Sequence, residues 1–263
     1  MRTTFASTGA RRTSREDEFD DGRRIALFLD VDGTLLDLTE RPDEVTVPRG
    51  LLASVAGAQA KTGGALALVS GRTIADLDRF FAPLRLPAAG VHGAELRLDP
   101  GEGVISPPGT NPLPPSLWTA LTDLLQGFPG TIAENKRFSY AVHYRLAPAV
   151  GDVLRRRLAT LLKTAPYSGI TMLEAHCAFE LKTREFDKGR AIATFLSAPP
   201  FLGRTPIFIG DDDTDEAGFA VVSARGGRAF SVGRPRPGAT ATFGSPSEVR
   251  GWLAGFAGVG ASV

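Results

Sequence analysis

The sequence contains little cysteine and little histidine: one cysteine, Cys177, and three histidines in 263 residues. A single cysteine cannot form an internal disulfide, and no group of Cys and His has the spacing of a zinc site. The formal net charge is only +1, so no strong field draws the protein to nucleic acid or to an anionic membrane. These absences favour a small-molecule partner and a reducing compartment. We therefore expect a cytoplasmic protein that binds neither nucleic acid nor membrane.

Long hydrophobic runs are also missing. No apolar run approaches the roughly 20 residues of a membrane helix. The first residues, "MRTTFASTGARRTSREDEFDDGRR", lack the apolar segment of a secretory signal and are too acidic for an organellar transit peptide. We predict a disordered tail over residues 1–22. Because 43% of the residues are hydrophobic, the remainder is expected to form well-packed cores.

Apolar runs and amphipathic stretches alternate from Ile25 onward. Four successive segments read "IALFLDVDG", "RGLLASVAGAQAKTG", "ALALVSGR" and "TIADLDRFFAPL". Short apolar runs separated by helical patterns are typical of parallel strands covered by helices on both faces. The same rhythm returns between "DKGRAIATFLSA" and "PSEVRGWLAGF" near the C-terminus. The pattern predicts an α/β fold with a doubly wound, mainly parallel sheet.

The middle of the chain has a different texture. The stretch "LDPGEGVISPPGTNPLPPS" is dense in proline and glycine, and it precedes a strand-like "RFSYAVHYRL" and a helical "AVGDVLRRRLATLLKTA". We predict that residues 105–182 form an inserted, smaller α+β domain. The core domain would then comprise residues 23–104 and 183–263.

Polar side chains close three of the apolar runs. Asp30 ends "LFLD", Ser70 ends "LALVS", and Asp211 follows "IFIG". In an open parallel sheet, ligands bind beyond the carboxyl ends of the strands, so these residues are candidates for one site. Turn and helix-capping chemistry could explain any one of them. The three together, with Lys188 before a helical pattern, favour a functional site.

These residue types suit the hydrolysis of a phosphate ester. The Asp30 carboxylate could attack phosphorus as a nucleophile and form an aspartyl-phosphate. Attack of an anion on an anion requires neutralising charge. We expect Mg²⁺ to supply it, held by Asp30, Asp211 and the backbone carbonyl of Asp32, with Lys188 as a fixed cation.

The neighbouring residues would complete this chemistry. We expect Asp32 to act as general acid and then as general base, protonating the leaving oxygen and activating water. The phosphate oxygens are expected to be held, together with Lys188, by four residues: Gly33, Thr34, Ser70 and Gly71.

Four motifs, "DVDGT", "SGR", "KG" and "GDDDTD", occur in this order and resemble those of the haloacid-dehalogenase-type phosphatases. An aspartate two residues after the first one is typical of the phosphatases, whereas the ion-pumping relatives have threonine there. The resemblance implies the catalytic roles given above. It adds Asp215 as a residue that orients metal-bound water.

Further motifs narrow the resemblance to one group. The segments "GVHGAELR", "ENKRFSYAVHYR", "FELK" and "GDDDTDE" together resemble the trehalose-6-phosphate phosphatases, over nearly the whole chain from Ile25. The resemblance implies a haloacid-dehalogenase-like core with a cap domain, dependence on Mg²⁺, and conversion of trehalose 6-phosphate to trehalose and phosphate. We expect the protein to be a monomer.

Charged residues of these motifs are expected to hold the sugar, because a disaccharide presents many hydroxyls that need acceptors and charged donors. The resemblance implies a substrate-binding role for six residues: His92, Glu95, Glu134, Lys136, Glu180 and Lys182. Two alternatives stay open. Glu and Lys two apart on a strand could form a solvated surface, and a lone histidine such as His92 could be a packing residue that supports the interdomain crevice.

Other assignments are also open. Arg72 could bond near the phosphate loop or tie a helix down, and His143 and Arg145 are interpreted as mainly shaping the cap. The stretch "LEAHCAFELKTREFDKG" departs from the family's pattern. The departure concerns the substrate-binding assignment of Glu180 and Lys182, which lie in this stretch.

For the whole protein, two alternatives stand beside the main hypothesis. One is another sugar phosphatase, acting on sucrose 6-phosphate or mannosyl-3-phosphoglycerate. The other is a noncatalytic sensor of trehalose 6-phosphate or a regulatory subunit of a synthase. The full set of catalytic carboxylates favours an enzyme.

Overall fold

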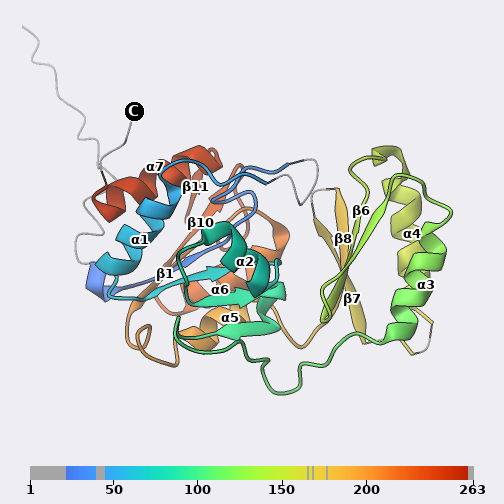
Figure 1. Cartoon of the computed structure of the whole chain (residues 1–263), viewed down its shortest axis with the longest axis horizontal. Helices are drawn as coiled ribbons and strands as arrows, with labels where there is room; N and C mark the ends of the chain where they lie inside the picture. Colours follow the sequence, from blue (N-terminus) through green and yellow to red (C-terminus); the bar gives the residue numbers. More distant parts are fainter. Residues whose placement is uncertain (1–21, 40–44, 165, 168, 176, 260–263) are drawn as a thin grey trace, which may run out of the picture.

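A computed structural model describes residues 22–39, 45–164, 166–167, 169–175 and 177–259 (Figure 1). The tail predicted for residues 1–22 lies outside this part of the chain except for Gly22, which begins a short 3₁₀ helix, η1 (Gly22–Arg24). Within the described residues the chain forms two separate sheets.

The larger sheet contains seven strands among the described residues, in the order β11-β10-β9-β1-β2-β3-β4. Neighbouring strands are parallel except for β4, which is antiparallel to β3. The strands are β1 (Ile25–Leu29), β2 (Leu66–Val69), β3 (Ala88–Gly90), β4 (Glu95–Arg97), β9 (Thr205–Gly210), β10 (Arg228–Val232) and β11 (Ala241–Phe243). The predicted α/β fold with a mainly parallel sheet is confirmed.

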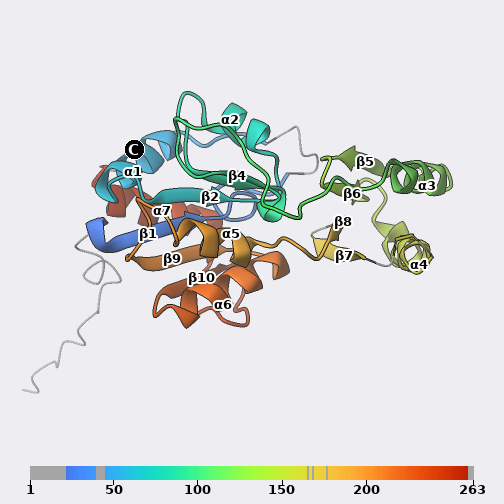
Figure 2. The ribbon, with the colours of Figure 1, turned by 90° about the horizontal axis from the view of Figure 1, so that it is seen from below.

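Helices cover both faces of this sheet (Figure 2). One face is covered by α1 (Leu51–Lys61), α2 (Ile74–Phe81) and α7 (Pro246–Ala257), and the other by α5 (Lys188–Phe195) and α6 (Glu216–Ala224). Successive strand side chains point to opposite faces, so Leu27 packs in one apolar cluster and Phe28 in the other. Burial on both faces explains why β1 reads as an unbroken apolar run.

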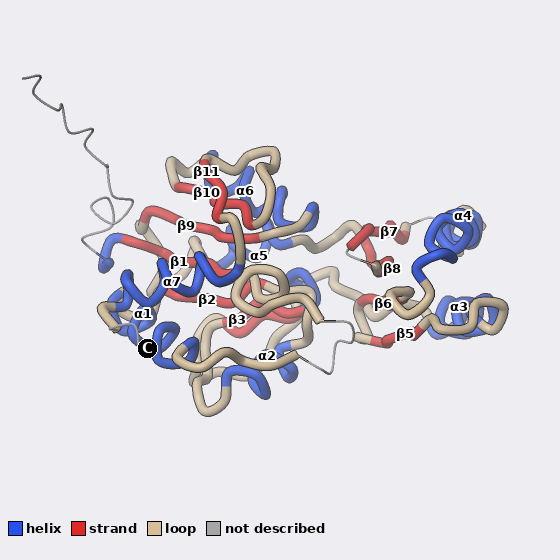
Figure 3. The backbone as a smooth tube through the Cα atoms, turned by 90° about the horizontal axis from the view of Figure 1, so that it is seen from above, coloured by secondary structure: helices blue, strands red, loops and turns tan. Residues whose placement is uncertain are grey.

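The smaller sheet is antiparallel, with the order β5-β6-β8-β7. Its strands are β5 (Ile132–Asn135), β6 (Ser139–His143), β7 (Ile170–Ala175) and β8 (Ala178–Thr183). Helices α3 (Pro115–Leu125) and α4 (Gly151–Leu162) lie on the side away from the larger sheet (Figure 3). Tyr140 and Leu181 pack against these helices. The alternate side chains, among them Ala141 and Glu180, therefore face the larger sheet. The domain boundaries at 104/105 and 182/183 stay a prediction.

Two short 3₁₀ helices lie at the carboxyl ends of the core strands: η2 (Val91–Gly93) after β3 and η4 (Asp213–Asp215) after β9. A further one, η3 (Pro148–Val150), precedes α4. Across the described residues, none of the helices has the length and apolar character needed to cross a membrane.

Candidate active site

A cavity lies between the carboxyl ends of the core strands and the helix-free face of the smaller sheet. The core side of its lining includes Asp30, Asp32, Ser70, Lys188 and Asp211. The side formed by the smaller sheet, here called the cap side, includes Glu134, Lys136, His143 and Glu180. Residues from segments far apart in the sequence thus share one cavity, as the motifs predicted.

Asp30 follows the last residue of β1 and is almost fully buried, at 3% exposure. Its Oδ1 lies 2.7 Å from the Nζ of Lys188, and its Oδ2 accepts a 3.1 Å hydrogen bond from Thr34 Oγ1. Burial raises the pKa of Asp30 to about 8, with Lys188 opposing the rise and Asp211 adding to it. The buried carboxylate is therefore short of balancing positive charge.

Three carboxylates meet at this point. Oxygens of Asp30, Asp211 and Asp215 all lie within 4.8 Å of one another. Burial and the nearby Asp212 and Asp215 also raise the pKa of Asp211, to about 7. A cluster of carboxylate oxygens with excess negative charge is the donor set that Mg²⁺ prefers, so these residues fit the predicted ion.

Asp215 organises this cluster. Its Oδ1 lies 2.6 Å from Lys188 Nζ, and its Oδ2 accepts 3.0 Å hydrogen bonds from the backbone N–H groups of Asp211 and Asp212. Lys188 thereby joins Asp30 to Asp215, and these contacts hold its pKa well above the usual value despite its burial. A bound ion would share Asp215 with this network.

The Asp32 side chain forms an ion pair with Arg72. Arg72 Nε lies 2.6 Å from one Asp32 oxygen and Nη2 lies 2.7 Å from the other, which is the bidentate geometry of strong guanidinium–carboxylate pairs. The guanidinium also lies 4.7 Å from the ring centroid of Phe80 in α2. Arg72 therefore bonds to the turn after β1 and also packs on helix α2.

The predicted phosphate-binding residues separate into two pairs. Ser70 and Gly71 line the cavity, whereas Gly33 and Thr34 are not among the described residues that do so. The N–H of Gly33 is donated to Leu36 and that of Thr34 to the carbonyl of Val31. In this structure the turn itself uses both N–H groups, and phosphate binding by Gly33 and Thr34 stays a prediction.

Gly33 has a different role in the turn. Its φ is +75°, and a Cβ built there would lie 2.2 Å from the nearest Asp211 oxygen. Glycine therefore permits the close approach of the β1 and β9 loops that brings Asp30 and Asp211 together.

Strand register aligns the cap side of the cavity. Ala141 in β6 pairs with Glu134 on β5 and with Glu180 on β8, and Glu180 in turn pairs with Leu173 on β7. Residues in register share one face of a sheet, so the two carboxylates lie on either side of a small residue. Ala141 lines the cavity between these two hydrogen-bond acceptors.

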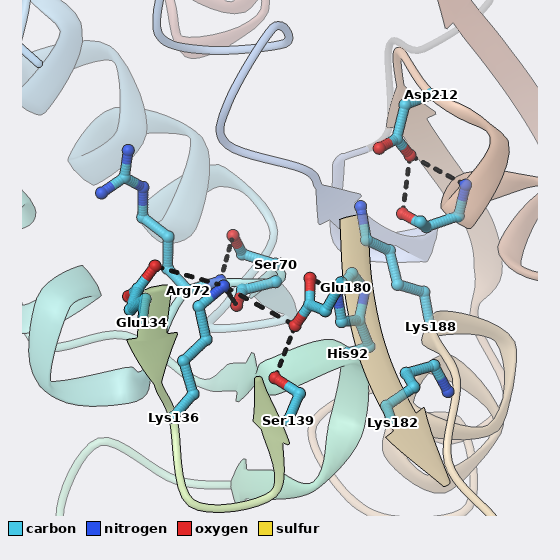
Figure 4. A network of polar contacts seen from close by, with 12 residues as sticks. Ser70, Arg72, His92, Glu134, Lys136, Ser139, Glu180, Lys182, Lys188 and Asp212 are labelled. Carbon is cyan, nitrogen blue, oxygen red and sulfur yellow. Dashed lines mark hydrogen bonds and ion pairs between the residues drawn. The ribbon is translucent and has the colours of Figure 1, made fainter. Parts of the chain in front are cut away.

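Lys136 lies between these carboxylates, with Nζ 3.9 Å from Glu134 and 3.6 Å from Glu180 (Figure 4). The same Nζ donates a 3.0 Å hydrogen bond to the backbone carbonyl of Gly71 on the core side. Burial alone would lower the pKa of Lys136, but the two glutamates raise it above its usual value. The lysine stays charged at neutral pH and touches both sides of the cavity.

His92, predicted to bind the sugar, and His143, interpreted as shaping the cap, are each paired with a glutamate. His92 Nε2 lies 2.8 Å from Glu180, and His143 Nε2 lies 3.1 Å from Glu134. Burial would raise the pKa of Glu180, but the adjacent His92 and Lys136 hold it well below the usual range. Both glutamates are therefore carboxylates at neutral pH, ready to accept hydrogen bonds.

Two residues predicted to bind substrate lie outside the cavity lining. The Glu95 carboxylate accepts a 2.8 Å hydrogen bond from the backbone N–H of Ile74. The amine of Lys182 donates to the carbonyls of Thr183 and Phe186, and its side chain is directed away from Glu180 and Lys136 (Figure 4). This arrangement gives no support to a sugar contact by either residue.

Two contributors were not identified from the sequence. Ser139 Oγ donates a 2.5 Å hydrogen bond to Glu180, and the alternation of Ser139 with Ala141 on β6 was the signal that could have indicated it. Arg236 donates to the backbone carbonyl of Asp211 and to the side chain of Asp213. It comes from a loop beyond β10, and no sequence spacing indicates that contact.

The fold and the core side of the cavity define the class of protein. A mainly parallel α/β sheet whose strand ends bring together two aspartates of a "DVDGT" motif, a serine, a lysine and an acidic loop is the architecture of the haloacid-dehalogenase-type phosphatases. The structure is similar to that of the C-terminal domain of trehalose-6-phosphate phosphatase from C. albicans, with a TM-score of 0.81 at 18% identity, covering 93% of this chain and 95% of that one.

Sequence comparison gives the particular family. The profile of the trehalose-phosphatase family matches residues 28–237. The chain is 37% identical over 231 residues to the trehalose-6-phosphate phosphatase of Escherichia coli (strain K12), covering 88% of this chain and 85% of that protein. It is 42% identical over 237 residues to a probable trehalose-phosphate phosphatase of Sinorhizobium fredii, covering 88% and 87%. The chain belongs to the trehalose-phosphatase family.

Proposed function

We propose that this protein hydrolyses trehalose 6-phosphate to trehalose and inorganic phosphate, with Mg²⁺, through an aspartyl-phosphate on Asp30. One observation carries the proposal. A single cavity joins the buried carboxylate–lysine cluster of the core to the row of Glu134, Lys136 and Glu180 on the cap side. The first suits a phosphate ester and the second suits a polyhydroxylated leaving group.

The core residues supply the reaction steps. The Asp30 carboxylate attacks phosphorus, and the bond between phosphorus and the sugar oxygen breaks. Asp32 gives its proton to that oxygen, and then takes a proton from the water that hydrolyses the aspartyl-phosphate. Because both Asp32 oxygens accept from Arg72 in this structure, Asp32 must leave Arg72 and take up a proton from solvent before it can donate to the leaving oxygen.

Positive charge and hydrogen-bond donors stabilise the transferred group. Lys188 neutralises part of the charge on Asp30, and Ser70 and Gly71 lie where they can hold phosphate oxygens. Mg²⁺ would be held by Asp30, Asp211 and the backbone carbonyl of Asp32, with Asp215 acting through water, and would neutralise charge between carboxylate and phosphate.

The cap side would select the sugar. We assign residues 105–182 as the cap, with Glu134 and Glu180 accepting from sugar hydroxyls and Lys136 donating to them. A site whose buried polar groups are satisfied only by a disaccharide rejects esters that leave those groups unpaired. The names of the related proteins point to the same substrate.

The test is phosphate release from trehalose 6-phosphate, sucrose 6-phosphate, glucose 6-phosphate and p-nitrophenyl phosphate, each with Mg²⁺ and with a chelator. We expect Mg²⁺-dependent turnover with a preference of several orders of magnitude for trehalose 6-phosphate. Equal rates on all four esters would retain the phosphatase and reject the substrate. No turnover together with binding of trehalose 6-phosphate would indicate the noncatalytic sensor.

A further inference from the structure

His92 joins the two sides of the cavity although it belongs to neither the catalytic cluster nor the cap. It lies in η2 on the core side and is 5% exposed, and its Nε2 is 2.8 Å from the Oε2 of Glu180 on the cap side. Among the described residues its Nδ1 has no hydrogen-bond partner. Because the Glu180 carboxylate can only accept hydrogen bonds, the imidazole donates to it from Nε2.

The backbone that carries His92 has an uncommon conformation. Val91 and His92 have φ values of 46° and 54°, in the left-handed region that is unfavourable for a β-branched residue such as Val91. The segment is fixed to residues 70–72, which follow β2. The N–H of Val91 donates to the Arg72 carbonyl at 2.8 Å, and that of His92 donates to the Ser70 carbonyl at 2.9 Å. These backbone contacts hold the segment in its strained conformation and direct the imidazole towards the cap side.

An apolar contact between the two sides lies beside the histidine. Val91 and Ala94, which flank His92 and Gly93, pack with Phe138 of the cap side and with Phe186 from the segment between β8 and α5. Phe138 directly precedes Ser139, the second hydrogen-bond donor to Glu180. The same junction therefore places both donors against the Glu180 carboxylate.

The two oxygens of Glu180 are held from different sides. Oε1 accepts from Ser139 at 2.5 Å and lies 3.6 Å from Lys136, and both of these partners belong to the cap side. Oε2 contacts His92 of the core. The cap's own residues thus fix one oxygen, while the orientation of the carboxylate about that contact depends on the core.

We propose that His92 is a positioning residue, which sets the orientation of the sugar-binding carboxylate Glu180 when the cap lies against the core. His92 then does not itself recognise the sugar. Because Oε2 meets His92 only when the two sheets are together, the sugar site is completed by docking of the cap. This inference rests on the proposed function, in which Glu180 binds the sugar of the phosphate ester.

A double-mutant cycle tests the proposal, with kcat and KM measured for trehalose 6-phosphate and for p-nitrophenyl phosphate. The variants are His92→Leu, His92→Gln, Glu180→Gln and the combination of His92→Leu with Glu180→Gln. Loss of a hydrogen bond to a charged group is expected to lower kcat/KM for the sugar ester by about ten- to a hundred-fold, mainly through KM. The fall for p-nitrophenyl phosphate should be several-fold smaller, because that ester has no sugar.

The combined variant and His92→Gln distinguish a positioning role from a general structural role. In the Glu180→Gln background, His92→Leu should cost little more, because its effect passes through Glu180. His92→Gln keeps an N–H donor and should recover most of the activity. Any of three results would overturn the proposal. They are multiplicative losses in the combined variant, equal losses on both esters, and an activity of His92→Gln as low as that of His92→Leu.

Two further measurements keep the result interpretable. If His92→Leu does not fold, His92→Asn takes its place, because its donor falls short of Glu180. If the wild-type protein prefers another sugar phosphate, the proposed substrate is wrong, and the cycle is run with the preferred ester. Coupling between His92 and Glu180 on that ester would support the positioning role, and its absence would overturn it.

Discussion

The core and cap sides of the cavity differ in what fixes their residues. On the core side, Asp30, Lys188 and Asp215 are 5% exposed or less in their side chains, and Lys188 Nζ lies 2.6–2.7 Å from an oxygen of each aspartate. On the cap side, Glu134 is 36% exposed in its side chain, and Lys136 contacts the two glutamates only at 3.6–3.9 Å. The cluster on the core side is thus already assembled, whereas Glu134 and Lys136 on the cap side keep room to adjust.

The difference indicates a division of labour. Charge compensation around phosphorus requires fixed groups, because reorganisation at the moment of reaction would cost rate. Recognition of hydroxyl groups tolerates exchangeable partners, since a ligand can replace existing contacts of the same kind. Changes on the core side should therefore affect every phosphate ester, and changes on the cap side mainly the sugar ester.

Replacement of the predicted nucleophile should give the largest effect. Asp30→Asn is expected to lower kcat by at least about 10³-fold on both trehalose 6-phosphate and p-nitrophenyl phosphate, because the covalent route is lost. Phosphate release measures it, with Asp99→Asn in the exposed turn after β4 as a matched control. Near-normal turnover by Asp30→Asn would refute the assignment of the nucleophile.

Removal of the buried lysine should affect activity and stability together. Lys188→Met leaves Asp30 and Asp215 without their shared cation, and breaking a buried pair in this way costs about 3–5 kcal/mol. We expect the free energy of unfolding in urea to fall by that order and kcat to fall by about 10²-fold or more on both esters. Lys163→Met, an exposed lysine at the end of α4, is the control. If Lys188→Met and Lys163→Met had the same free energy of unfolding, Lys188 would not stabilise the fold through Asp30 and Asp215.

A cap-side change should be smaller and selective. Lys136→Met removes the cation between Glu134 and Glu180 and the bond to the Gly71 carbonyl. We expect kcat/KM for trehalose 6-phosphate to fall by about ten- to a hundred-fold, largely through KM, and that for p-nitrophenyl phosphate to fall less. Equal losses on the two esters would remove the distinction between the two sides.

Mg²⁺ should stabilise the fold more at high pH than at low pH. The pKa of Asp30 is raised from 3.8 to about 8, so the folded metal-free protein holds this proton more tightly than the unfolded chain does. Stability from this group is therefore complete below about pH 4 and is lost as the pH rises towards 8. An ion that binds the carboxylates replaces the proton and becomes more stabilising as the pH rises.

Thermal unfolding measures this effect. We expect saturating Mg²⁺ to raise Tm by several degrees at pH 8 and by clearly less at pH 5. The Asp211→Asn variant should show a smaller increase at pH 8. An increase that is independent of pH would disagree with a site built on Asp30 and Asp211.

The same contrast explains how far the sequence alone leads. The core residues Asp30, Ser70 and Asp211 could be predicted to lie together because each follows a buried parallel strand, and the carboxyl ends of such strands meet at one edge. Glu134 and Lys136 could be predicted to share a face from their spacing of two. These inferences need only the direction and period of strands.

The remaining contacts depend on long-range register and loop paths. The alignment of Glu134 with Glu180 through Ala141 follows from a three-strand register that no local pattern fixes. Lys182 lies on the same strand face as Glu180, yet the adjacent segment offers backbone carbonyls that bind its amine. Glu95 is likewise engaged by the backbone N–H of Ile74. Residue type and spacing alone could not separate these two from the glutamates that line the cavity, Glu134 and Glu180.

The most direct test of the division of labour is to find where each ester leaves its phosphoryl group, and at what concentration. The wild-type enzyme with Mg²⁺ is mixed with trehalose 6-phosphate or p-nitrophenyl phosphate, quenched in acid within one turnover, and examined by peptide mass spectrometry. Both esters should phosphorylate Asp30, with half-maximal labelling at a concentration at least about tenfold lower for trehalose 6-phosphate. Labelling of another residue, or equal concentrations for the two esters, would contradict a core that performs the chemistry beneath a cap that selects the sugar.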